Sequence, residues 1–254
     1  MLKEIKRIKA FDYLEIGEGH PIVLLHGLMG GLSNFEKSIK VLSQKYRVIV
    51  PKIPFYNLPV AESTVENISL KFLEFLQLLT DEPVILIGNS IGGHIALLTA
   101  INNPTIIKGL ILTGSSGLYE KSFGDTFPKR GNYDYVKGKS SEIFYDPSTA
   151  TKELVDEVYA TVNDKEKAIR TLYIARSAIN NNLEEYLNKI EIPVCLIWGN
   201  QDSVTPPEVA IKLNKLIKNS TLSWIDKCGH AAMMEQPDFF NTLVLKWLEE
   251  TLHK

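Results

Sequence analysis

The sequence predicts an α/β fold built on a mostly parallel central sheet. Short apolar runs rich in Val, Ile and Leu recur along the chain, and stretches of helical period separate them. Several of these runs are apolar at consecutive positions, which is typical of strands that helices cover on both faces. The expected buried strands are residues 21–25, 46–50, 83–87, 107–112, 193–198 and 221–225.

Two further segments fit this fold class. Residues 3–14 predict one or two antiparallel edge strands, and the glycine-rich residues 17–19 predict the turn into the first buried strand. After the second buried strand, apolar residues recur at intervals of three and four, which predicts a helix packed on the sheet. Those residues are Val65, Ile68, Phe72, Phe75, Leu76 and Leu79.

The alternation of strands and helices stops after Gly117. Residues 118–188 contain no buried-strand pattern and are expected to be helical around 152–159 and 166–179. Because long insertions in compact domains are usually lids or binding loops, we expect a core domain of residues 1–117 and 189–254 with a cap at 118–188. The aromatic residues of this cap are expected either to face a substrate or to form a small helical core; they are Tyr119, Phe123, Phe127, Tyr133, Tyr135, Phe144 and Tyr145.

Composition and charge exclude several classes of function. The 254 residues are 44% hydrophobic and 23% charged, as in ordinary globular proteins, and the net charge of −2 provides no basic face for nucleic acid. No apolar stretch is long enough to cross a membrane, and residues 1–9 lack the apolar region of a secretory signal. A cytoplasmic location and a small-molecule substrate are therefore expected. Cys195 and Cys228 lack metal-site spacing and are expected to be buried free thiols.

The segment Gly88-Asn89-Ser90-Ile91-Gly92 has the pattern G-x-S-x-G between an expected strand and an expected helix. This context is typical of a nucleophile elbow, in which serine lies on a sharp turn and the glycines allow the helix to pack close to the sheet. At a helix N-terminus, N–H groups and the helix dipole favour the negative charge that develops during attack. Ser90 is therefore the predicted nucleophile.

A serine nucleophile needs a general base and a group that orients this base. His230 follows the last expected strand, at the sheet edge where open α/β sheets bind ligands, and is the predicted base. Asp202 follows the preceding expected strand and is the predicted carboxylate that orients the imidazole. Asp226 is the alternative, although it ends its strand with little length to turn back. Of the other histidines, His20 and His253 are expected in solvent, His94 is expected to lie on the surface of its helix or to pack there, and His26 belongs to a glycine-rich loop.

Two main-chain N–H groups are expected to bind the negatively charged oxygen of the reaction intermediate. One is that of Ile91, directly after the nucleophile. The other is expected from residues 26–31, where three glycines let the main chain approach a ligand closely, with Leu28 as the donor. The candidates for substrate contact are His26, Gly27 and Asn89, and His26 is expected mainly to support its loop by hydrogen bonding. No metal or other cofactor is required for this chemistry.

Together these motifs resemble those of the α/β-hydrolase superfamily along nearly the whole chain. The resemblance rests on His26-Gly27 after a strand, the elbow at residues 88–93, Trp198 to Asp202 with Pro206 after it, and Gly229-His230. It implies the α/β-hydrolase fold, with helices on both sides of the sheet and an inserted helical cap. It also implies serine hydrolysis by Ser90, Asp202 and His230.

The elbow Gly-Asn-Ser-Ile-Gly-Gly is similar to that of hydrolases that cleave carbon–carbon bonds in ring-fission products. The chain departs from those enzymes at Leu28-Met29-Gly30, where they have Gly-Pro-Gly, and at Ala231, where they have tryptophan. They also bind the substrate carboxylate with a cap arginine, for which Arg170 and Arg176 are candidates, although helix arginines more often make surface contacts.

We therefore expect an esterase that cleaves a small or medium carboxylic ester through an acyl-enzyme. The first alternative is carbon–carbon bond hydrolysis of a vinylogous diketo acid. The second is a ligand receptor or scaffold of the same fold, although such a protein has no physical need for an activated serine.

Overall fold

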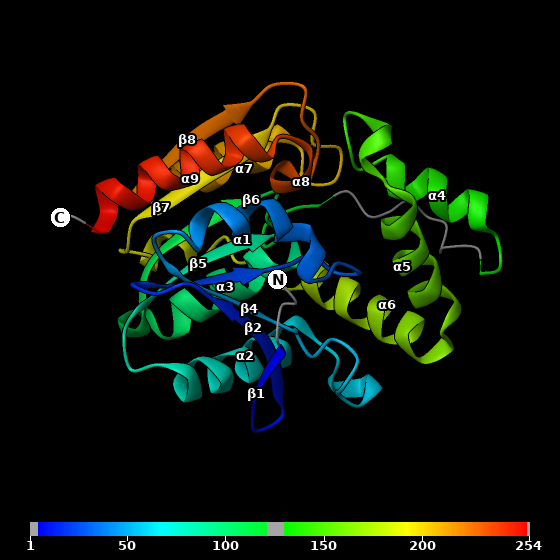
Figure 1. The fold of residues 1–254 in the computed structure, drawn as a ribbon, viewed down its shortest axis with the longest axis horizontal. Coiled ribbons are helices and arrows are strands. Elements are labelled where there is room, and N and C mark those ends of the chain that lie inside the picture. Colours follow the sequence, from blue (N-terminus) through cyan, green and yellow to red (C-terminus); the bar gives the residue numbers. More distant parts are fainter. Residues whose placement is uncertain (1–4, 121–129, 253–254) are drawn as a thin grey trace.

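The computed structural model describes residues 5–120 and 130–252. Its strands are β1 (Ile5–Ile8), β2 (Phe11–Ile16), β3 (Pro21–Leu25), β4 (Arg47–Pro51), β5 (Val84–Asn89), β6 (Ile107–Thr113), β7 (Val194–Gly199) and β8 (Ser220–Ile225). They form one sheet in the order β1-β2-β4-β3-β5-β6-β7-β8 (Figure 1). The pairs β1/β2 and β2/β4 are antiparallel, and every other pair is parallel. The predicted mostly parallel sheet is thus confirmed.

Helices cover both faces of this sheet. The pleat sends successive side chains to opposite faces, so a strand with consecutive apolar residues has an apolar side chain on each face for a helix to cover. On one face Val23 and Leu25 share a core with α2 (Val65–Leu79), α3 (Ile91–Asn102) and α7 (Pro207–Leu216). On the other face Ile22 and Leu24 share a core with α1 (Glu36–Leu42), α8 (Ala232–Glu235) and α9 (Pro237–Leu252). Figure 1 shows α2 and α9 on opposite sides of the sheet. The predicted apolar stripe of residues 65–79 lies in the first of these cores.

The segment between β6 and β7 contains α4 (Tyr133–Ser141), α5 (Lys152–Asn163) and α6 (Lys165–Asn180). These helices gather beyond one side of the sheet in Figure 1, and α6 packs on the core through Ile174 and Ala178. Of the aromatic residues expected here, Phe144 is buried and Tyr119 and Tyr145 are exposed, whereas Phe123 and Phe127 lie outside the described residues. The short 3-10 helices of the chain are η1 (Leu32–Phe35), η2 (Val60–Glu62), η3 (Pro104–Ile106), η4 (Pro147–Thr149) and η5 (Leu187–Lys189).

The structure bears on the predictions for the two cysteines and for membrane-spanning segments. Cys195 and Cys228 are free, buried thiols, and burial raises the pKa of each to about 12. Across residues 5–120 and 130–252, no helix has the length and apolarity needed to span a membrane.

Candidate active site

The topology brings the three predicted triad residues to one edge of the sheet. Ser90 directly follows β5, Asp202 lies in the loop after β7, and His230 lies in the loop after β8. These three strands are parallel to one another within the sheet. Their carboxyl ends therefore share one edge, which is where open α/β sheets bind ligands.

Ser90 occupies a sharp turn between β5 and α3. Its φ of 55° and ψ of −123° form a conformation that costs a non-glycine residue about 1–3 kcal/mol. The flanking glycines permit the close approach that this turn requires: a Cβ on Gly92 would lie 2.2 Å from the carbonyl oxygen of Leu25. The turn is held by the Ser90 N–H, which donates to the Thr113 carbonyl at 3.3 Å, and by the Ser116 N–H, which donates to the Ser90 carbonyl at 3.2 Å.

His230 and Asp202 form a buried, hydrogen-bonded pair. The Nδ1 of His230 lies 3.0 Å from Oδ2 and 3.2 Å from Oδ1 of Asp202. Asp202 is itself fixed, because its carboxylate accepts the N–H groups of Val204 and Thr205 at 2.9 Å and the Thr205 hydroxyl at 2.8 Å. With Nδ1–H donating to Asp202, Nε2 is the nitrogen that can accept a proton.

The electrostatic surroundings of His230 favour its protonated form. Burial alone would lower the pKa of His230, but the Asp202 carboxylate outweighs this effect and, with a contribution from Glu120, raises the pKa above its ordinary value. Glu120 is partly buried in the chain segment that follows β6. Burial raises the pKa of Glu120, while nearby His230 and the Ser116 hydroxyl act in the opposite direction. Sequence reasoning missed Glu120 and Thr205, since both act through contacts formed only in the folded chain.

Asn89 connects the nucleophile turn to the loop of His230. Its side-chain amide donates to the Thr113 carbonyl at 3.0 Å and to the His230 carbonyl at 3.1 Å. Asn89 was predicted to contact substrate, but the structure places its buried amide group between two main-chain carbonyls. The ring of His230 also lies against Gly114, where a Cβ would come within 2.8 Å of Nδ1.

Ser90 is partly buried. Within the described residues its hydroxyl forms no hydrogen bond, including none to His230. Such catalytic contacts are often long before substrate binds and shorten in the complex. The described structure therefore places Ser90 and His230 at the same edge of the sheet without a direct hydrogen bond between them.

The predicted oxyanion donors flank Ser90. Ile91 begins α3, and the loop that contains Leu28 passes beside the nucleophile, because a Cβ on Gly27 would lie 3.4 Å from the Ser90 Cβ. Within the described part of the chain, neither the Leu28 nor the Ile91 N–H donates to a protein acceptor. An oxyanion donor must have no other acceptor, so both N–H groups remain candidates for that role.

His26 supports the glycine-rich loop that carries Leu28. It is buried, with 4% of its surface exposed, and its Nδ1 lies 2.9 Å from the Gly27 carbonyl oxygen. The Gly30 N–H donates to the same carbonyl at 3.0 Å. The ring of His26 also packs edge-on against Phe55. These contacts give the loop a defined shape next to Ser90.

The alternative carboxylate and the other histidines lie elsewhere. Asp226 is exposed, and its carboxylate accepts hydrogen bonds from Asn200 and Gln201. His94 is fully buried in α3 with Nε2 3.0 Å from Oδ1 of Asn181, and burial lowers the pKa of His94 to about 4. His20 was predicted to be solvated but is partly buried, and His253 lies outside the described residues.

Arg170 and Arg176 were the candidates to bind a substrate carboxylate. Arg170 donates from Nε to the Leu58 carbonyl at 2.8 Å and pairs with Glu166 at 3.2 Å. Arg176 is exposed on α6. Arg170 therefore joins α6 to the main chain at Leu58.

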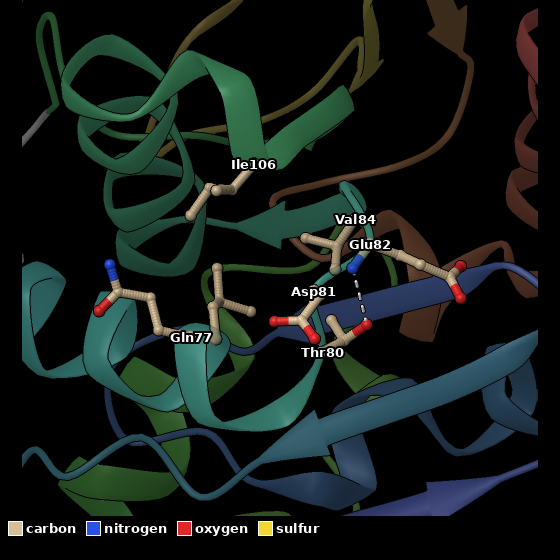
Figure 2. A pocket seen from close by; sticks show the side chains of 7 residues that line it. Gln77, Thr80, Asp81, Glu82, Val84 and Ile106 are labelled. Atoms are coloured by element: carbon tan, nitrogen blue, oxygen red, sulfur yellow. Dashed lines mark hydrogen bonds between the residues drawn. The ribbon is translucent and has the colours of Figure 1, made fainter.

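Two surface hollows lie at the opposite edge of the sheet. One of about 230 Å³ lies where α2 ends and β5 begins, and is lined by Leu76, Gln77, Thr80, Asp81, Glu82, Val84 and Ile106 (Figure 2). The other, of about 350 Å³, lies near the first residues of β6, β7 and β8. Both are at the amino ends of the parallel strands and contain none of the predicted site residues. Over the described ranges, no group of three or more His, Cys, Asp and Glu residues could hold a metal ion.

Comparisons with known proteins agree with this architecture. The chain matches the alpha/beta hydrolase fold family over residues 20–177 and 173–237. A 2-hydroxy-6-oxo-6-(2'-aminophenyl)hexa-2,4-dienoic acid hydrolase of Metapseudomonas resinovorans is 28% identical, with 93% of this chain and 86% of the relative covered. An alpha/beta hydrolase enzyme from a sediment metagenome of the Mar Chica lagoon, Morocco, is 44% identical, with a TM-score of 0.80 over 97% of this chain and 98% of that one. A meta-cleavage product hydrolase from Pseudomonas fluorescens shares the fold at 22% identity, with a TM-score of 0.83 over 94% of each chain. The chain therefore belongs to the alpha/beta hydrolase fold family and is a hydrolase.

Proposed function

We propose that this hydrolase is a serine carboxylesterase that cleaves small or medium esters through an acyl-enzyme. The observation that carries the proposal is the buried pair of His230 and Asp202, 3.0 Å apart, at the same sheet edge as the strained Ser90. A carboxylate that orients the imidazole and stabilises its protonated form is what a histidine base requires.

In the first half of the proposed reaction, Ser90 Oγ attacks the ester carbonyl carbon while Nε2 of His230 accepts the hydroxyl proton. The carbonyl oxygen becomes negatively charged and accepts hydrogen bonds from the N–H groups of Leu28 and Ile91. When the bond between the carbonyl carbon and the alcohol oxygen breaks, the protonated His230 gives its proton to the departing alcohol. An ester between Ser90 and the acyl group remains.

In the second half, water replaces the alcohol. His230 accepts a proton from water, whose oxygen attacks the acyl carbon, and the same two N–H groups hold the oxyanion. The bond to Ser90 Oγ then breaks, and His230 returns a proton to that oxygen. The products are a carboxylic acid, an alcohol and the original enzyme.

The charges near His230 favour a neutral ester over a dienoic acid. Glu120 interacts electrostatically with His230, and a substrate carboxylate at that position would experience like-charge repulsion. Arg170, a candidate partner for such a carboxylate, is bound to Leu58 and Glu166. The alternative, carbon–carbon bond hydrolysis, is supported by the names of several relatives. These relatives are 27–28% identical to this chain and are named as hydrolases of dienoic or dienedioic acids.

The experiment that separates these activities compares kcat/KM of the purified protein on aryl esters of graded acyl length and on a 2-hydroxy-6-oxohexa-2,4-dienoic acid. We expect the short or medium esters to be the better substrates and Ser90→Ala to abolish their turnover without changing the circular dichroism spectrum. A higher kcat/KM on the dienoic acid would replace the esterase proposal with carbon–carbon bond hydrolysis. Absence of turnover on both substrate classes would favour a receptor or scaffold.

A further inference from the structure

A single carboxylate connects the cap to the loop that carries His230. Glu235, the last residue of α8, accepts the Gly229 N–H on Oε2 and the Asp146 N–H on Oε1, each at 2.6 Å. Gly229 directly precedes His230, and Asp146 belongs to the cap segment between α4 and α5. Glu235 thus bridges two parts of the chain that are far apart in sequence.

Main-chain contacts continue the same junction. We call residues 142–146 the cap base. The His230 N–H donates to the Ile143 carbonyl at 2.8 Å, and the Ser203 hydroxyl donates to the Glu142 carbonyl at 3.1 Å. The cap base therefore contacts both the loop of His230 and the loop of Asp202.

The packing at Gly229 leaves no space between the loop and the cap base. A Cβ at this position would lie 2.4 Å from the Ile143 carbonyl oxygen and 2.9 Å from the Phe144 Cα. Such distances are far inside van der Waals contact, so only glycine allows this approach. Any displacement of the cap base is consequently transmitted to the main chain of His230.

The bridge requires a carboxylate in particular. Its two oxygens accept two converging N–H donors, and hydrogen bonds to an ionised acceptor are about twice as strong as neutral ones. Glutamine has one acceptor oxygen, and its NH2 group would face an N–H, leaving that donor unpaired. Substitution of Glu235 by glutamine therefore breaks the bridge while preserving the size of the side chain.

We propose that Glu235 and the cap base position the general base, so that the cap holds His230 in its reactive place. This assignment of Glu235 as a positioning residue rests on the proposed function, because it takes His230 as the base. The main chain of His230 is then held on its N–H by the cap and on its carbonyl by Asn89. A displacement on the order of 1 Å in an active site can reduce the rate about 100-fold.

The test compares Glu235→Gln with Glu142→Gln. Glu142 is the matched control, because only its main-chain carbonyl takes part in the junction, whereas its exposed carboxylate pairs with Lys139 at 2.7 Å. For each variant we would measure kcat and KM on the preferred ester, the pH dependence of kcat/KM, and the rate at which a fluorophosphonate labels Ser90.

For Glu235→Gln we expect kcat and the labelling rate to fall about tenfold or more, with KM nearly unchanged. The acid limb of kcat/KM should move to lower pH, because a looser contact with Asp202 lets the pKa of His230 fall toward its ordinary value. Glu142→Gln should match the wild type. Gly229→Ala, which retains Glu235 but displaces the cap base, should reproduce the loss.

Wild-type kcat and an unmoved acid limb in Glu235→Gln would overturn the proposal. The proposal would also be overturned if the activity lost in Glu235→Gln were no larger than its unfolded fraction, with the pH profile of the folded variant unchanged. If the wild type cleaves no ester, the esterase assignment fails independently, and the labelling rates of Ser90 in the variants still test the positioning of His230.

Discussion

The side-chain amide of Asn89 donates a hydrogen bond to the main-chain carbonyl of His230, 3.1 Å away. The residue before the nucleophile thus holds the main chain of the predicted base. Because the same amide also donates to Thr113 at 3.0 Å, the ends of β5 and β6 and the loop after β8 are fixed together. This buried side chain therefore contributes directly to the relative placement of Ser90 and His230.

Asn89→Ala should therefore lower kcat while leaving KM nearly unchanged. The substitution leaves the His230 carbonyl without its Asn89 donor and the Thr113 carbonyl with only the Ser90 N–H, so we expect the free energy of unfolding to fall by about 1–3 kcal/mol. Steady-state kinetics on the preferred ester and urea unfolding would measure the two effects. An increase in KM at unchanged kcat would instead indicate that Asn89 contacts substrate.

Asp202→Asn should reduce kcat by about 10⁴-fold, because the amide no longer selects the productive tautomer of His230 or stabilises its protonated form. Asp226→Asn is the control, since Asp226 is exposed and hydrogen-bonded to Asn200 and Gln201. The kcat of both variants on one ester gives the comparison. Equal losses in the two variants would contradict the assignment of Asp202.

The pH dependence of kcat/KM should report the raised pKa of His230. The base must be neutral to accept a proton, so activity should decline as the pH falls, with a midpoint above the ordinary value of 6.5. Glu120→Gln removes a negative charge that raises this pKa, and should move the acid limb to lower pH. An acid limb at the same pH in both proteins would show that Glu120 does not act on His230.

Glu120→Gln should also change the preference for charged substrates. We expect the kcat/KM on an aryl ester that carries a free carboxylate to increase relative to that on a neutral ester of the same length, because like-charge repulsion is removed. The ratio of the two values in the variant and the wild type is the measurement. An unchanged ratio would remove Glu120 from substrate selection.

His94 should make the fold sensitive to acid. Its pKa is lowered to about 4 in the folded protein from the ordinary 6.5, so between these values the unfolded chain binds a proton that the folded chain excludes. Stability that is present above the ordinary pKa is then lost as the pH falls, by up to about 1.4 kcal/mol per pH unit. Urea unfolding at about pH 7 and about pH 5 should show a smaller loss for His94→Gln than for the wild type. Equal losses would contradict this role.

Local patterns predicted most of the fold. Each buried strand expected from an apolar run is present, with its ends shifted by at most two residues, because burial on both faces demands consecutive apolar side chains. The turn at Ser90 was also predictable, since the glycines around it are required by close main-chain approach. The predicted preference for Asp202 over Asp226 agrees with their surroundings, because Asp202 lies within hydrogen-bond distance of His230, whereas Asp226 is bound to Asn200 and Gln201.

The missed residues act between segments distant in sequence. Thr205 contacts Asp202 within one loop, but Glu120 and Glu235 contribute only where the segment between β6 and β7 lies against the residues around His230. No periodicity or spacing encodes how a cap docks on a core. The hydrogen bond of Asn89 illustrates the same limit, since its partner His230 lies 141 positions away.

Fluorophosphonate labelling followed by peptide mass spectrometry tests most directly whether Ser90 is an activated nucleophile. We expect one phosphonyl group on Ser90 in the wild type, none on Ser90→Ala, and much slower labelling of His230→Ala. An unlabelled wild-type protein, or labelling of Ser90 that is equally fast without His230, would contradict the assignment of Ser90 as the activated nucleophile.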